Sequence, residues 1–169
     1  MDDVREHFVG PALRPGGRPS PSLVVPGLLI GEYPTPADVP WLRTAHGVTA
    51  VVSLQDDADL AAKRLRLADL ERAYAGAGIA FHRLPVGDGD TDAMAAALGD
   101  VVALVERLVG DGACVYLHCN AGLNRAPTAA IAWLHAARGL PLAAAAAHVK
   151  ARRACVPYLR LLDAHFARR

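Results

Sequence analysis

An apolar run that turns through a short glycine-containing loop into a helix constrains this fold more than any other part of the sequence. The run covers residues 115–117, the loop covers 118–125, and a helix-favouring segment begins near Thr128. Gly122 permits a sharp loop that other residues resist, and Pro127 is tolerated in a first helical turn, where the N–H groups lack partners. The segment therefore predicts a strand, a tight loop and a helix N-terminus in direct succession.

This loop also has the chemistry of an anion site with a nucleophile. Its backbone N–H groups and the helix dipole favour negative charge, and the guanidinium of Arg125 can grip two oxygens of a phosphate. The same positive features favour the thiolate of Cys119, which would act as a nucleophile. A buried cysteine and a surface arginine are each ordinary alone, but together they indicate a cysteine-dependent phosphatase. The predicted phosphate-binding residues are Asn120, Ala121, Gly122, Leu123, Asn124 and Arg125.

Strand-like and helix-like segments alternate along the rest of the chain. Apolar runs and turn residues predict strands over 28–31, 49–54, 79–84 and 113–117. Helices are predicted over 35–45, 60–75, 93–109, 125–138, 142–152 and 157–167. This alternation predicts an α/β fold with a central, mostly parallel sheet flanked by helices, and ligands bound beyond the carboxyl ends of the strands. Residues 1–22 are rich in proline and glycine and are expected to be irregular, with the catalytic domain over 23–169.

Composition narrows the class of protein. The chain has 169 residues, of which 53% are hydrophobic and 21% charged, as in one globular domain. A net charge of +1 gives no bulk attraction to nucleic acid or to a membrane. Three cysteines, an odd number, without an apolar leader predict a reducing, cytoplasmic setting. The histidines lack metal-ligand spacing and no nucleotide-binding fingerprint occurs, so we expect no metal and no cofactor. The sequence does not indicate an oligomeric state.

The pattern His118-Cys119-x-x-Gly122-x-x-Arg125 resembles the signature of the protein tyrosine phosphatase superfamily, particularly its dual-specificity branch. Within that branch, residues 119–123 are similar to the loop of the laforin-like and plant starch-excess glucan phosphatases. Three more stretches, 52–59, 88–90 and 152–157, resemble that group in the same order. The resemblance implies a cysteine-phosphatase fold and hydrolysis of phosphate monoesters through a phosphocysteine intermediate.

Three positions depart from the pattern of those relatives. Ala126 stands where most members of the superfamily have a serine or threonine that helps the thiolate leave, although the plant glucan enzymes share the alanine. Asn124 replaces a glycine of the glucan-type loop. Gly89 replaces an aromatic residue between two acidic positions.

A general acid is expected on the loop that follows the strand at 79–84. Asp88 matches the first acidic position of the family's Asp-x-Asp segment, and it must be protonated when the ester binds. Asp90 is the alternative acid. If neither residue is catalytic, Asp88 and Asp90 belong to an ordinary solvated acidic loop that turns at Gly89. We expect Asp92 to cap the following helix. His118 is predicted to support the loop by hydrogen bonding; otherwise it is a buried histidine without a catalytic role.

Other polar residues have two readings each. One group follows the strand at 49–54 and is expected either to line the site entrance or to form a solvated turn: Gln55, Asp56 and Asp57. The basic pair Arg152 and Arg153 is expected either to receive an anionic substrate or to end a helix in solvent.

The two remaining cysteines, Cys114 and Cys155, are expected to be small buried residues. A disulfide from either one to Cys119 is the less favoured alternative. Tyr158 is expected in the core or at its rim.

The partner is a phosphorylated substrate, and three substrate classes remain open. Phosphorylated carbohydrate is favoured by the glucan-type loop, and phosphotyrosine, phosphoserine or phosphothreonine in proteins is the alternative. Phosphoinositides are less favoured because Asn120, Leu123 and Asn124 are neutral. A non-catalytic phosphate-binding module is the alternative from another functional class.

Overall fold

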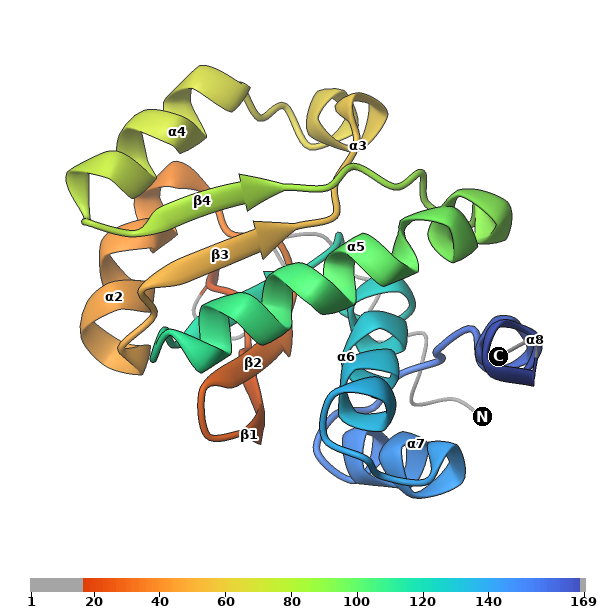
Figure 1. Cartoon of the computed structure of the whole chain (residues 1–169). Helices are drawn as coiled ribbons and strands as arrows, with labels where there is room; N and C mark the ends of the chain where they lie inside the picture. The colour runs from red at the N-terminus through yellow and green to blue at the C-terminus, as the bar shows by residue number, and fades with distance from the viewer. Residues whose placement is uncertain (1–16, 168–169) are drawn as a thin grey trace.

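The protein is built around a five-stranded sheet with the strand order β1-β2-β5-β3-β4 (Figure 1). The computed structural model describes residues 17–167. The strands are β1 (Ser22–Val25), β2 (Leu28–Gly31), β3 (Ala50–Ser53), β4 (Ala80–Arg83) and β5 (Val115–His118). Strands β2 to β5 are mutually parallel where they pair, and β1 pairs antiparallel with β2 at one edge. The predicted α/β fold with a mostly parallel sheet is therefore confirmed.

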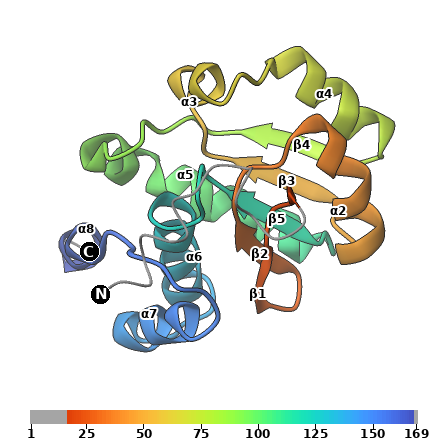
Figure 2. The same cartoon turned by 180° about the vertical axis from the view of Figure 1, so that it is seen from behind.

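Helices cover both faces of this sheet. They are α2 (Val39–His46), which follows the 3-10 turn η3 (Pro36–Asp38), then α3 (Asp57–Ala62), α4 (Leu67–Gly76), α5 (Thr91–Gly110), α6 (Arg125–Ala136), α7 (Leu142–Lys150) and α8 (Leu159–Ala167). Helix α5 crosses the front of the sheet in Figure 1, and α2 lies in front in the reverse view of Figure 2. Of the helices among residues 17–167, none is both long enough and apolar enough to cross a membrane.

Successive residues of the buried strands feed two separate cores, because neighbouring side chains of a strand point to opposite faces. Leu117 packs with the core under α5 and α6, whereas Tyr116 packs with the core under α2 and α4. Both faces are covered, and the central strands are therefore apolar throughout. This explains why they are read easily from the sequence as continuous apolar runs.

The first strand was missed by the sequence analysis. Ser22 was assigned to an irregular segment, but it begins β1, which pairs with β2 across a tight turn at Pro26 and Gly27. Only four residues long, β1 gives a weak periodic signal. The expectation for residues 1–16 lies outside the described residues.

The single helix predicted over 60–75 is wrong. The chain forms α3 and α4 instead, and Arg64 between them takes a left-handed backbone with φ of 54°. Helix α3 begins with a reciprocal cap, in which Asp56 accepts from the N–H of Asp59 and Asp59 accepts from the N–H of Asp56. A capping pattern of this kind fixes a helix start locally, three residues before the predicted one.

The carboxyl ends of the central strands meet at one edge of the sheet. His118, the last residue of β5, lies opposite Gly31 of β2 on one side and Ser53 of β3 on the other. The loop after β5 therefore begins at the middle of the sheet, between the loops that follow its neighbours. This is the position at which parallel α/β sheets bind ligands.

Candidate active site

The loop from Cys119 to Asn124 joins β5 directly to α6, as predicted. Cys119 is 2% exposed and packs at the end of the strand, and Gly122 has a left-handed backbone with φ of 64°. The loop therefore turns sharply at Gly122 before the first residue of α6.

Each carbonyl oxygen of this loop is hydrogen-bonded to a group of the surrounding protein. The partners are the Nδ1 of His118 for Cys119, the N–H of Tyr33 for Asn120, the guanidinium of Arg153 for Ala121 and Gly122, the N–H of Val156 for Leu123, and Thr128 for Asn124. A peptide N–H points opposite to its own C=O, so these bonds leave the N–H groups directed away from the surrounding protein. Such a row of N–H groups is an anion-binding concavity.

Arg125 supplies two further donors to this space. Its side chain is 1% exposed, and its Nη1 donates to Asp59 at 2.6 Å and to the carbonyl of Val86 at 2.7 Å. The Nε and Nη2 atoms are buried and have no hydrogen-bond partner among the described residues. Buried donors without partners are costly. Two adjacent ones on a planar guanidinium match the geometry of a bound phosphate.

A buried chain of side chains holds Arg125 in place. The carboxylate of Asp59 accepts from Arg125 through Oδ2 and from the Nδ2 of Asn120 through Oδ1 at 2.6 Å. The Nε2 of Gln55 in turn donates to the Oδ1 of Asn120 at 2.8 Å. Burial raises the pKa of Asp59, but the hydrogen bonds and the positive charge of Arg125 outweigh it and lower that pKa overall. Asp59 is therefore a carboxylate at neutral pH.

No sequence pattern assigned a role to Asp59, which the structure places against Arg125. It lay in the stretch 52–59 that carries the resemblance, and its cap partner Asp56 was read only as an entrance or turn residue. The Asp-x-x-Asp spacing of a helix cap was the available signal. Neither reading of Gln55 was right, because its side chain is 1% exposed and belongs to the buried chain. Asp57 is exposed and pairs with Arg83, which fits the solvated reading.

The acid loop, residues 85–90, brings Asp88 to the site. Its Oδ1 lies 3.4 Å from the Nη2 of Arg125, and its side chain is 52% exposed. Asp90 is the N-cap of α5, where its carboxylate accepts from the N–H of Ala93 at 2.9 Å. The expectation that Asp92 caps this helix is therefore wrong. The engagement of Asp90 leaves Asp88 as the carboxyl group directed at the phosphate loop.

His118 is buried and lies within hydrogen-bond distance of the loop that follows it. Its Nδ1 lies 3.0 Å from the carbonyl oxygen of Cys119, an acceptor, so Nδ1 carries the proton. Burial lowers the pKa of His118 to about 4, with the charge of Arg125 acting in the same direction. The ring is neutral at physiological pH, and it acts on the loop through this hydrogen bond rather than through a positive charge.

Arg153 is hydrogen-bonded to the phosphate loop, and the prediction that it ends a helix in solvent is wrong. It is 9% exposed, and its Nη2 and Nε donate to the carbonyls of Ala121 and Gly122 at 3.0 and 2.8 Å. Its charge is balanced by Glu32, whose Oε1 lies 3.3 Å from Nη2. Arg153 is therefore largely shielded from solvent and engaged by groups of the protein. Arg152 is exposed.

The three cysteines are free thiols. Cys114 and Cys155 are half-buried, and burial raises the pKa of both. The less favoured disulfide to Cys119 is absent from the structure.

Sequence comparisons place this site in a known family. The sequence model described as "Dual specificity phosphatase, catalytic domain" matches residues 29–160. The chain is 27% identical to laforin of Mus musculus over 146 residues, covering 80% of this chain and 44% of laforin. It is 30% identical to the amyloplastic phosphoglucan phosphatase DSP4 of Castanea sativa over 142 residues, covering 82% of this chain and 37% of that protein. The chain thus spans less than half the length of these two relatives.

Solved structures share the fold. The phosphatase Tk-PTP in its active form superposes with a TM-score of 0.73 at 24% identity, covering 89% of this chain and 98% of that one. PTPMT1 superposes with a TM-score of 0.71 at 20% identity, covering 88% and 95%. At these identities the likeness concerns the fold, and it confirms the predicted cysteine-phosphatase architecture. With the family match over most of its length, the chain belongs to the dual specificity phosphatases, a family of phosphoric monoester hydrolases.

Proposed function

We propose that this chain hydrolyses phosphate monoesters through a phosphocysteine intermediate on Cys119, with a phosphorylated glucan as its substrate. One observation carries the proposal. The loop that starts at Cys119 has its carbonyls bonded outward, and the buried Nε and Nη2 of Arg125, at the end of this loop, donate no hydrogen bond to the described residues, although Nη2 also pairs with Asp88 at 3.4 Å. That arrangement fits the three non-bridging oxygens of a phosphoryl group, which carry the charge of the transition state.

In the first step the thiolate of Cys119 attacks phosphorus, and the bond from phosphorus to the ester oxygen breaks. Asp88 gives its proton to that oxygen, so the substrate leaves as a neutral alcohol. The N–H groups of the loop and Arg125 stabilise the transferring phosphoryl group.

In the second step a water molecule attacks phosphorus and the sulfur–phosphorus bond breaks. Asp88, now a carboxylate, takes the proton of the water, and inorganic phosphate leaves. Ala126 is buried and has no hydroxyl group to assist the departing thiolate. In this chain the loop N–H groups must therefore suffice to stabilise the thiolate.

The proposal of a glucan substrate rests on the relatives and on the charge around the loop. Laforin and the phosphoglucan phosphatase match the greater part of this chain. Asn120, Leu123 and Asn124 add no charge around the phosphate, and the cation behind the loop, Arg153, is occupied by loop carbonyls. A substrate that is uncharged apart from its phosphate suits such a site.

We also place the protein in a reducing compartment such as the cytoplasm. Its three cysteines are free, and the mechanism needs Cys119 as a thiol.

Phosphate release by wild type and by Cys119→Ser tests the function. The panel contains p-nitrophenyl phosphate, phosphorylated amylopectin, phosphotyrosine and phosphoserine peptides, and phosphoinositide vesicles. We expect release that depends on Cys119 and is fastest for amylopectin, while Cys119→Ser still binds inorganic phosphate. Preference for a phosphopeptide would overturn the glucan assignment and keep the chemistry. Turnover by Cys119→Ser would overturn the nucleophile, and phosphate binding without any turnover would indicate a binding module.

A further inference from the structure

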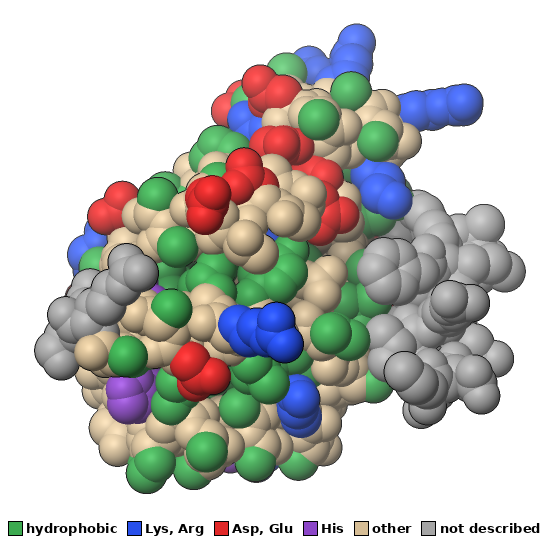
Figure 3. Space-filling view, turned by 90° about the vertical axis from the view of Figure 1, so that its right-hand side faces the viewer, with side chains coloured by type: hydrophobic (Ala, Val, Ile, Leu, Met, Phe, Trp, Pro, Cys, Tyr) green, Lys and Arg blue, Asp and Glu red, His purple; other side chains and the backbone are tan. Residues whose placement is uncertain are grey.

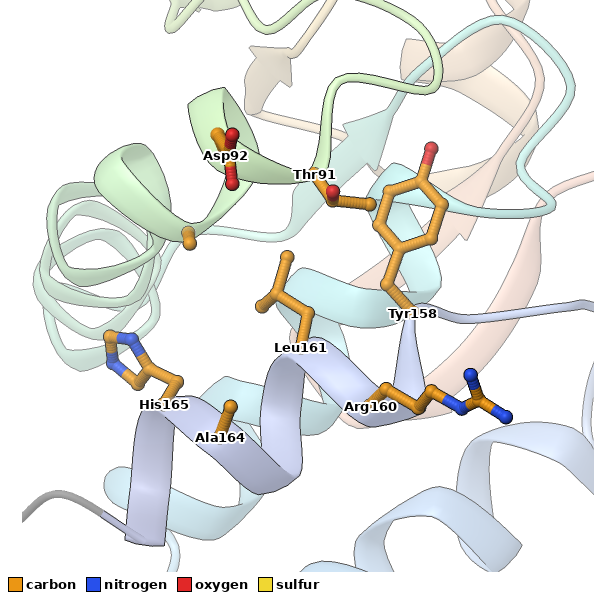
Figure 4. Close-up of a pocket in the computed structure, with 8 residues that line it drawn as sticks. Thr91, Asp92, Tyr158, Arg160, Leu161, Ala164 and His165 are labelled. Carbon is orange, nitrogen blue, oxygen red and sulfur yellow. The ribbon is translucent and has the colours of Figure 1, made fainter.

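Tyr158 joins the acid loop to the end of the phosphate loop. Its backbone N–H donates to the Oγ1 of Thr128 at 2.8 Å, and that hydroxyl donates to the carbonyl of Asn124 at 2.7 Å. Its own hydroxyl accepts from the N–H of Gly89 at 3.2 Å. One residue of the segment before α8 is thereby hydrogen-bonded, directly or through Thr128, to both loops. Figure 4 shows the ring beside Thr91, with its hydroxyl directed away from α8.

The tip of the acid loop has few other restraints. Gly89 has a left-handed backbone with φ of 78°, and no atom lies within 4 Å of the position that a Cβ would take there. The two ends of the loop are fixed, because Val86 bonds to Leu54 and Arg125, and Asp90 caps α5. Between these ends lies Asp88, in a turn closed by the bond from the N–H of Asp90 to the carbonyl of Gly87, with its own carboxylate 3.4 Å from the Nη2 of Arg125.

Packing does not fix the Tyr158 ring on all sides. The ring lines a groove of about 800 Å³ between the start of α5 and α8, together with Thr91, Asp92, Leu161 and His165 (Figure 4). In the space-filling view of this side of the molecule, apolar side chains line the hollow and acidic ones gather above it (Figure 3). Tyr158 packs on the core with one side and borders the groove with the other, so its two hydrogen bonds add to packing in holding the ring in position.

The electrostatic surroundings keep the Tyr158 hydroxyl neutral. Burial raises its pKa, and the charges of Asp88 and Cys119 act in the same direction against the effects of Gly89 and Arg125. The hydroxyl is a poor proton donor for catalysis, but a neutral oxygen accepts well from a backbone N–H. Tyr158 is therefore not a second candidate for the general acid.

We propose that Tyr158 is the positioning residue of the general acid: its hydroxyl fixes Gly89 and so holds Asp88 over the leaving oxygen. The inference rests on the proposed function, with Asp88 as the acid. A group that places the acid matters most when the leaving oxygen needs a proton, and little when the alkoxide is already a good leaving group.

The test compares wild type and Tyr158→Phe on aryl and alkyl phosphates with graded leaving groups. Tyr158→Phe keeps the ring and removes the acceptor. We expect kcat to fall about 10-fold for alkyl phosphates, a fraction of the effect of general acid–base catalysis, and less than about 2-fold for p-nitrophenyl phosphate. In an Asp88→Asn background the same change should have no further effect, because the two residues act as one unit. An equal loss across leaving groups, or no loss, would overturn the inference.

A second readout does not depend on turnover. Hydrogen exchange at the amide of Gly89, followed by NMR, should accelerate in Tyr158→Phe and stay unchanged in Arg160→Gln, which alters an exposed residue lining the same groove. An unchanged Gly89 amide would overturn the positioning role. If exchange accelerates while wild type lacks turnover that depends on Cys119, the Tyr158 hydroxyl does restrain Gly89, and it is the proposed function that has failed.

Discussion

The carboxylate of Asp59 lies 2.6 Å from the Nη1 of Arg125, and both side chains are buried behind the phosphate loop. The nitrogen atoms of the Arg125 guanidinium therefore differ in their partners. Nη1 donates to Asp59 and to the carbonyl of Val86, whereas Nε and Nη2 make no hydrogen bond among the described residues and Nη2 faces the carboxylate of Asp88 at 3.4 Å. Asp59 therefore fixes the plane of the guanidinium that, in the proposed function, binds the phosphate.

Asp59→Asn should lower kcat/KM about 100-fold, because a misplaced guanidinium loses its fit to the transition state. Loss of the charge also leaves Arg125 buried without a counterion, which should lower the free energy of unfolding by about 3–5 kcal/mol. Steady-state kinetics and urea unfolding measure the two effects. Asp57→Asn, an exposed carboxylate two residues away, is the matched control. Equal kinetics for the two variants would contradict the role of Asp59.

Substitution of Asp88 and substitution of Asp90 should have different effects on the rate of hydrolysis. Asp88→Asn should slow alkyl phosphates by about 10²–10⁴-fold and affect p-nitrophenyl phosphate far less. Asp90→Ala should leave this leaving-group dependence unchanged, and it should lower the free energy of unfolding by about 1 kcal/mol through loss of the α5 cap. Kinetic series with both variants decide between them; an altered leaving-group dependence in Asp90→Ala would move the acid to Asp90.

Gly122→Ala should abolish phosphate binding. The added Cβ would lie 2.6 Å from the backbone carbon of Gly31 and 2.7 Å from the Nη2 of Arg153, so the loop or its support must shift. Gly139→Ala is a matched control, because it has a similar φ of 72° with nothing within 4 Å. That variant should lose only about 1–2 kcal/mol of stability to backbone strain. Calorimetric titration with inorganic phosphate separates them, and retained binding by Gly122→Ala would refute the tight fit.

The buried ring of His118 should make stability fall with acid. In the folded chain its pKa is about 4, below the ordinary 6.5, so between these values the unfolded chain binds a proton that the folded chain does not. The contribution is complete above pH 6.5 and is lost as the pH falls to 4, a total of about 3 kcal/mol. Urea unfolding of wild type and His118→Asn between pH 7 and 4 should show a shallower pH dependence in the variant. Parallel pH curves would show that His118 does not carry the effect.

The sequence was sufficient for features that local residue chemistry determines. The run at 115–117, Gly122 and Arg125 predicted the strand, the loop and the helix start, because each is set by neighbours in the chain. The roles of Asp59 and Arg153 were not predictable in the same way. Both act on residues more than 30 positions away along the chain, and a charged residue reads as solvated until a buried partner is seen.

The cap of α5 shows the limit at short range. Asp90 and Asp92 are both residue types that favour an N-cap, and a difference of two residues in the helix start decides between them. That decision also bears on the catalytic acid, since the capping carboxylate is committed to the helix. Small errors in element boundaries thus become larger ones in assigning roles.

Several of the outward bonds of the phosphate loop come from distant parts of the chain. Tyr33 reaches it from beyond β2, whereas Arg153 and Val156 reach it from between α7 and α8. Detachment of the last two helices and the segment between them would leave the sheet hydrogen bonds in place and release the carbonyls of Ala121, Gly122 and Leu123. Turnover is therefore a sensor of local opening at the C-terminal end: in mild denaturant it should disappear while the circular dichroism of the sheet is still that of the folded protein.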